Sequence, residues 1–133
     1  MSFRIVRLLA DPAQPSAGQR FQLTAELDQS ASSDVRVLLE KQRIVKGNSG
    51  VPELRPTGPD YFALDPQPIK IQAGTNRGTS EPIEVRTNAI AQPGEPPVRF
   101  PEQLLFTAFD DPPGEFHCQV LTILRPPDTT LIR

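Results

Sequence analysis

The sequence predicts an all-β domain, a two-sheet sandwich of about seven antiparallel strands with little or no helix. Three observations carry this prediction. Apolar and polar residues alternate in short runs, which is the period of a half-buried strand. The 133 residues include 16 prolines and eight glycines, and proline breaks helix interiors. No proline-free window of eleven or more residues repeats apolar side chains at helical spacing.

The clearest strands are residues 21–27 and 35–39, in which apolar side chains recur at every second position. Residues 28–34 between them are rich in Asp and Ser, which favour turns. Because this connection is long for a tight hairpin, we expect the chain to cross there from one sheet to the other. Residues 3–9 form a preceding edge strand, and Asp11-Pro12 ends it.

The middle of the chain has a looser pattern. Residues 43–46 are predicted to be a short strand of their own. Residues 51–68 contain five prolines and are predicted to be irregular. Their large apolar side chains, Tyr61, Phe62 and Leu64, are expected to pin this stretch to the core.

The second half of the chain returns to alternation. Its predicted strands are residues 69–73, 83–85, 98–109 and 116–124. Residues 110–115 connect the last two strands as a hairpin loop. The predicted domain is a single unit over residues 1–133, and residues 126–133 are expected to form a flexible tail.

Charge, hydropathy and cysteine count indicate which classes of partner and which cellular compartments are expected. The formal net charge of -2 disfavours nucleic acid and anionic membranes as partners. No stretch approaches the roughly 20 apolar residues of a membrane span, and the N-terminus does not match a signal peptide. The chain is therefore expected in the cytoplasm if Met1 is the native start, and outside the cell if it is a fragment of an exported protein. The single cysteine excludes an internal disulfide.

Three stretches resemble bacterial immunoglobulin-like domains and the related Calx-beta sandwiches. They are residues 17–27 with 34–39, residues 58–61 with 69–75, and the closing strands around residues 107–109 and 116–120. The second stretch is similar to the run G-x-D-Y followed by I-x-I-x-A-G in those modules. This resemblance implies an immunoglobulin-like sandwich, and a Calx-beta relationship implies calcium bound by acidic loops at one end.

The acidic loop supplies the candidate metal ligands, Asp110, Asp111 and Glu115, with Asp60 elsewhere in the chain. Calcium takes six to eight oxygen ligands, usually from several carboxylates. The run of acids typical of the family is not reproduced, and prolines follow Asp111. The favoured interpretation is therefore a solvated hairpin loop, and Asp60 is expected to bond nearby backbone amides.

No arrangement typical of catalysis stands out. His117 and Cys118 are neighbours on a strand, so their side chains point to opposite faces and cannot act as a pair. Cys118 shares its face with Phe116 and Val120 and is predicted to be an inert core thiol, whereas His117 is predicted at the surface. With one His and one Cys, a protein-only zinc site lacks ligands. We therefore expect neither an enzyme nor a cofactor.

A basic stretch precedes the first long loop. Its members are interpreted as a solvated or edge-protecting face, with binding of an acidic partner as the alternative: Arg36, Lys41, Arg43 and Lys46. The leading functional hypothesis is a non-catalytic interaction or structural module. It would contact another protein, or a second copy, through sheet edges or loops. The alternative is a calcium- or carbohydrate-binding sandwich, which the resemblance and the acidic loop suggest.

Overall fold

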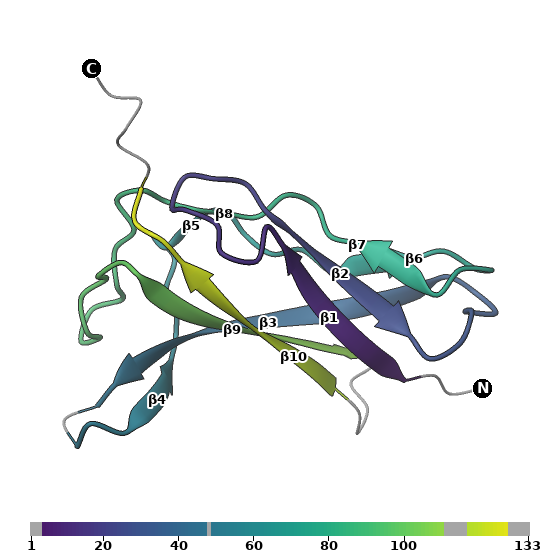
Figure 1. The fold of residues 1–133 in the computed structure, drawn as a ribbon, viewed down its shortest axis with the longest axis horizontal. Helices are drawn as coiled ribbons and strands as arrows, with labels where there is room; N and C mark the ends of the chain where they lie inside the picture. The colour runs from purple at the N-terminus through teal and green to yellow at the C-terminus, as the bar shows by residue number, and fades with distance from the viewer. Residues whose placement is uncertain (1–3, 48, 111–116, 128–133) are drawn as a thin grey trace.

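The computed structural model describes residues 4–47, 49–110 and 117–127, and within these residues the chain is all-β, without a helix (Figure 1). It contains ten strands in antiparallel sheets, where about seven were expected. The strands that were not expected lie at residues 52–55, 62–64 and 77–79, and each is three or four residues long. The strands are β1 (Ile5–Asp11), β2 (Gln22–Leu27), β3 (Val35–Lys46), β4 (Pro52–Arg55), β5 (Phe62–Leu64), β6 (Ile69–Ile71), β7 (Arg77–Thr79), β8 (Glu84–Val85), β9 (Glu102–Asp110) and β10 (His117–Leu124).

One sheet has three strands in the order β1-β2-β7. β1 is an edge strand, as the sequence predicted, and its register on β2 shifts once, between Ile5 and Arg7. β5 and β8 pair with each other in a separate two-stranded ladder. An isolated bridge between Phe21 and Ile83 joins the two pieces, because Phe21 directly precedes β2 and Ile83 directly precedes β8.

The second sheet has five strands. Its main path is β10-β9-β3-β4, and β6 pairs with β3 beside that path. β10 pairs with β9 along its whole length, from Glu102 opposite Leu124 to Phe109 opposite His117. The predicted pairing of the last two strands is therefore confirmed. The loop of residues 111–116 lies outside the described residues.

β3 is a single strand of twelve residues, so the prediction of a separate strand at residues 43–46 is wrong. Its partner β9 pairs with it from Val37 to Ile44, and this ladder bridges the point where the apolar alternation weakens. β3 then turns back into β4. The expectation that residues 51–68 are irregular is therefore wrong in part, because β4 and β5 both lie in this stretch.

The sheets share one hydrophobic core. Phe21 beside the three-stranded sheet meets Phe106 of β9 edge to face, with ring centroids 6.0 Å apart. Val37 belongs to the same cluster, and Val120 packs against it. The predicted crossing between residues 27 and 35 is confirmed, because β2 and β3 belong to different sheets.

Two of the three predicted anchors of the middle stretch are correct. Tyr61 and Phe62 are buried in the core and their rings pack edge to face, at a centroid distance of 5.1 Å. Leu64 is instead 36% exposed. It pairs opposite Glu84 beyond a register shift in the β5–β8 ladder, which turns its side chain outward.

Candidate interaction surface

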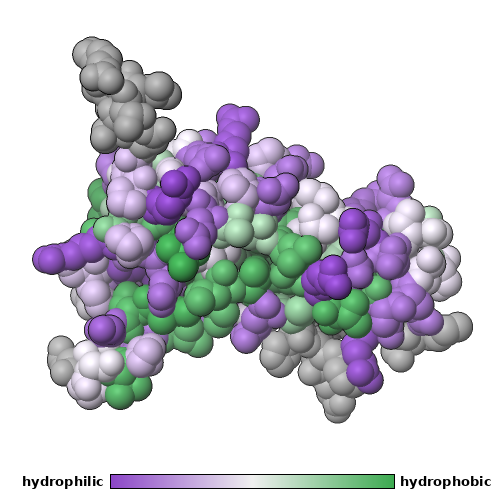
Figure 2. Space-filling model, viewed as in Figure 1, coloured by the Kyte–Doolittle hydropathy of each residue, from purple (hydrophilic) through white to green (hydrophobic). Residues whose placement is uncertain are grey.

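The edge strands β1 and β10 of the two sheets lie side by side (Figure 1). Both expose large apolar side chains: Val6 is 48% exposed, Leu9 47% and Leu121 50%. Figure 2 shows a band of hydrophobic surface over this part of the molecule. We call the surface formed by Val6, Leu9, Leu121 and Ile123, together with the free backbone edge of β10, the β1–β10 margin.

β10 has the composition of a buried strand although it lies at an edge. Its eight residues include no Asp, Glu, Lys, Arg or Pro. Leu124 and Thr122 face the core and are fully buried, and the alternation sends Leu121 outward. Charged side chains and prolines are the usual protection of an edge strand, and this strand lacks them.

On the outer face of the five-stranded sheet, apolar side chains and glutamines lie next to one another in the rows that begin at β10. Leu121 lies opposite Leu105 of β9. One row further along, Ile123 lies opposite Gln103, which in turn lies opposite Ile44 of β3. Cross-strand neighbours on one face are in contact, so these residues form a continuous surface that begins at the free edge of β10.

The chain itself pairs with one end of this edge. Ser16 forms a parallel bridge with Arg125, directly after β10. The Arg125 N–H donates to the Pro15 carbonyl at 2.8 Å, and the Ala17 N–H donates to the Arg125 carbonyl at 2.9 Å. Within the described part of the chain, no other backbone hydrogen bond crosses the outer edge of β10. From His117 to Leu124 this edge makes no backbone hydrogen bond within the described residues, although β1 lies beside β10.

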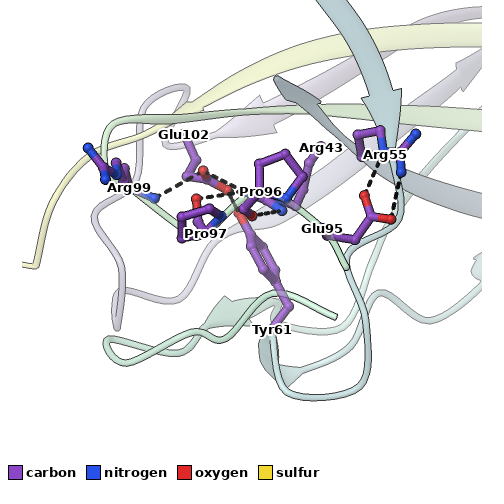
Figure 3. Close-up of polar contacts among 8 residues, drawn as sticks. All are labelled: Arg43, Arg55, Tyr61, Glu95, Pro96, Pro97, Arg99 and Glu102. Atoms are coloured by element: carbon purple, nitrogen blue, oxygen red, sulfur yellow. Dashed lines mark hydrogen bonds and ion pairs between the residues drawn. The ribbon is translucent and has the colours of Figure 1, made fainter. Parts of the chain in front are cut away.

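A buried ionic network lies at the opposite end of β9 from the 111–116 loop (Figure 3). The Arg43 side chain on β3 is fully buried and donates from Nε and Nη2 to both carboxylate oxygens of Glu102, at 2.9 and 3.1 Å. Its Nη1 and Nη2 atoms donate to the Pro96 and Pro97 carbonyls at 2.9 and 3.3 Å. The guanidinium therefore makes four hydrogen bonds that hold the loop before β9 against the sheet.

Tyr61 completes this network. Its hydroxyl donates to Glu102 Oε1 at 2.9 Å, and the Arg43 guanidinium carbon lies 6.0 Å from its ring centroid. Burial away from water, followed by the negative charge of Glu102, raises the pKa of Tyr61 well above its usual value of 10. Glu102 also accepts from the Arg99 backbone N–H. These hydrogen bonds hold the loop of residues 96–99 against the start of β9.

A second ion pair holds the same loop from outside. Arg55 of β4 donates from Nε to Oε1 of Glu95 and from Nη2 to Oε2 of Glu95, the second bond at 2.7 Å (Figure 3). The hydrogen bonds from Arg55 lower the pKa of Glu95. This bidentate geometry is the strong form of the pair, and it ties β4 to the loop that Arg43 also holds.

The four basic residues that we interpreted as one solvated face differ in their burial. Arg36 and Lys46 are exposed and Lys41 is half-buried, but Arg43 is buried, so the interpretation is wrong for Arg43. A signal was present: Arg43 has the same parity as Val37 and Leu39, and in a continuous strand such residues share a face. We missed the Arg43–Glu102–Tyr61 network because the strand was expected to break before residue 43.

For the other predicted site residues, the structure describes few side chains. Asp110 ends β9, but its side chain and both Asp111 and Glu115 lie outside the described residues. Among the residues that are described, no group of three or more His, Cys, Asp or Glu side chains could hold a metal ion. The solvated hairpin loop stays a prediction, and calcium binding by its acidic residues stays the alternative to it. Cys118 is half-buried and packs against the core, as its parity indicated, and the His117 side chain is not described.

Comparisons of this chain with models of known families, with curated proteins and with solved structures give no match. No helix long and apolar enough to cross a membrane occurs in the described ranges.

Proposed function

We propose that this chain is a non-catalytic protein-interaction module built on an immunoglobulin-like two-sheet sandwich. The strand order supports the fold. An immunoglobulin-like domain has strands in the order A-B-E-D in one sheet and G-F-C in the other, to which variable-type domains add C′. Here β1-β2-β7, continued by β8 and β5 through the Phe21–Ile83 bridge, matches the first sheet. The path β10-β9-β3-β4 matches the second.

The edge of β10 is the observation that carries the interaction function. A strand that offers unpaired backbone groups and exposed apolar side chains is a template for another strand. β10 has both features and none of the usual protection. Burying one leucine side chain contributes about 1.5–3 kcal/mol, so even the few exposed residues of the margin can support binding.

An affinity capture with three forms of the chain tests this function. The wild type, Leu121→Lys and Ile90→Lys are immobilised and exposed to lysate of the source organism. Ile90 is a matched control, because it is 59% exposed and lies outside the strands. We expect a partner to be retained by the wild type and by Ile90→Lys and lost with Leu121→Lys. Equal retention on all three, or on none, would contradict an interaction function at the β1–β10 margin.

A further inference from the structure

We infer that a groove at one end of the five-stranded sheet binds an acidic peptide segment that carries a large apolar side chain between its carboxylates. The groove lies between the last residues of β3 and the loop that leads into β9, and we call it the β3–β9 groove. It is a second surface with a partner of stated chemistry, so it goes beyond the proposed function. Of the four side chains of the β1–β10 margin, only Ile123 also lines this groove.

Much of the groove lining is apolar. Ile44 of β3 and Ile123 of β10 lie on either side of Gln103 in one row of the outer sheet face. The loop adds prolines, which have no backbone N–H to donate: Pro96, Pro97 and Pro101. The groove has a volume of about 700 Å³, which is within the range of ligand sites. A large apolar side chain is the group that such a lining accepts.

The loop side of the groove is fixed from within the protein. Residues 86–101 contain no strand, and so long a connection in a compact domain is usually either functional or disordered. Here Arg43 donates to two proline carbonyls of the loop from the inside, and Arg55 binds Glu95 from the outside (Figure 3). Because the wall is already ordered, a ligand does not have to supply the entropy cost of ordering it.

The charge of the groove indicates an anionic occupant. Its lining has three cations, Arg43, Lys46 and Arg99, and one carboxylate, that of Glu102, in a chain whose formal net charge is -2. Glu102 neutralises Arg43. The other two cations are exposed and form no ion pair within the described residues, not even with Glu53, which borders an adjacent depression. One cation from the strand and one from the loop are complementary to two carboxylates.

A peptide matches both properties of the groove. A small anion would reach the cations and leave the apolar lining in water. A nucleic acid would meet the negative net charge of the chain as a whole. An acidic peptide pairs its carboxylates with Lys46 and Arg99 and buries its apolar side chain against the isoleucines and prolines. The exposed Gln103 amide offers donors and an acceptor to the peptide backbone.

Fluorescence anisotropy with a defined probe tests this site. The probe is a labelled peptide with capped ends, in which glutamates flank a central leucine on both sides. We expect saturable binding that weakens as salt is added, because the two cations are exposed to solvent. A matched peptide with glutamines in place of the glutamates should bind roughly tenfold more weakly. Alanine in place of the leucine should weaken binding roughly fivefold.

Variants of the chain locate the binding. Lys46→Gln and Arg99→Gln should each weaken binding of the acidic peptide about threefold, and the double variant about tenfold, which is typical of exposed ion pairs. Lys70→Gln is the matched control. It removes an exposed lysine from the same sheet near the other end of β3, where Lys70 lies opposite Arg36. This control should bind like the wild type, and circular dichroism shows whether each variant keeps its fold.

Three results would overturn the inference: no saturable binding of the acidic probe, equal binding of the acidic and neutral peptides, or equal affinities for Lys70→Gln and the double variant. Tighter binding of a labelled single-stranded oligonucleotide through the same two cations would overturn a peptide as the occupant. Leu121→Lys leaves the groove lining unchanged and should not weaken peptide binding. Failure at this groove is therefore distinguishable from failure of the interaction function at the β1–β10 margin.

Discussion

Replacing Arg43 by methionine is the sharpest test of what holds the loop before β9 in place. Methionine keeps much of the side-chain volume and removes the charge. The substitution deletes four hydrogen bonds and leaves the Glu102 carboxylate, which is 8% exposed, without its cation. Removing one partner of a buried ion pair costs about 3–5 kcal/mol, because an uncompensated charge stays buried. We expect Arg43→Met to lower the free energy of unfolding by about this amount.

The same reasoning predicts recovery when the remaining polar groups are also removed. Adding Glu102→Leu deletes the orphaned carboxylate, but leaves the Tyr61 hydroxyl buried without an acceptor, at a cost of about 1–3 kcal/mol. Adding Tyr61→Phe removes that group too. We therefore expect the triple variant to be more stable than Arg43→Met alone, because apolar residues often replace a buried ion pair without loss.

Urea unfolding followed by far-ultraviolet circular dichroism measures these differences. Lys46→Met on the same strand is the control, because Lys46 is exposed and its replacement should change the free energy of unfolding by less than about 0.5 kcal/mol. A loss below about 1 kcal/mol for Arg43→Met would refute the reasoning. So would a triple variant that is less stable than the single one.

Four further predictions follow from individual groups. Because the pKa of Tyr61 is raised in the folded state, its phenol should ionise only as the protein unfolds above about pH 10, which ultraviolet absorbance detects cleanly for the only tyrosine. The hydrogen bonds from Arg55 lower the pKa of Glu95, so this pair contributes stability above pH 4.5 that is lost on further acidification, and Glu95→Gln should flatten the acid limb of a melting-temperature profile. The buried Thr122 hydroxyl has no hydrogen-bond partner among the described residues, so Thr122→Val should stabilise the fold by about 1 kcal/mol in urea unfolding. A Cβ at Gly78 would lie 2.5 Å from a backbone carbonyl oxygen of β6, so Gly78→Ala should destabilise the fold by about 1–3 kcal/mol.

Each of these predictions has an outcome that contradicts it. Titration of the Tyr61 phenol near pH 10 with an intact circular dichroism spectrum would show that the hydroxyl is not buried in the network. An unchanged acid limb in Glu95→Gln would remove the contribution of the Arg55 pair. A less stable Thr122→Val would mean that the hydroxyl has a partner, and a neutral Gly78→Ala would mean that β6 and β7 separate easily.

The fold class and several strands could be predicted because each depends on a local pattern. Alternation in residues 21–27 places Leu23, Ala25 and Leu27 on a face that is fully buried. The connection of residues 28–34 was long enough to indicate a change of sheet, and the structure confirms it. The strands at β4 and β5 were not predictable in this way, because they are short, lie among prolines and depend on partners distant in sequence.

The features of the candidate site also separate into those that the sequence predicts and those that depend on the tertiary structure. The sequence alone determined that β10 is an apolar, uncharged strand, since composition and parity are local properties. That it lies at an edge, beside β1, depended on the tertiary structure, because strand order is set by how non-adjacent segments pack on a common core. The burial of Arg43 also depended on the tertiary structure. A guanidinium enters the interior only where Glu102, Tyr61 and two loop carbonyls meet it, and these groups lie 18 to 59 positions away in the chain.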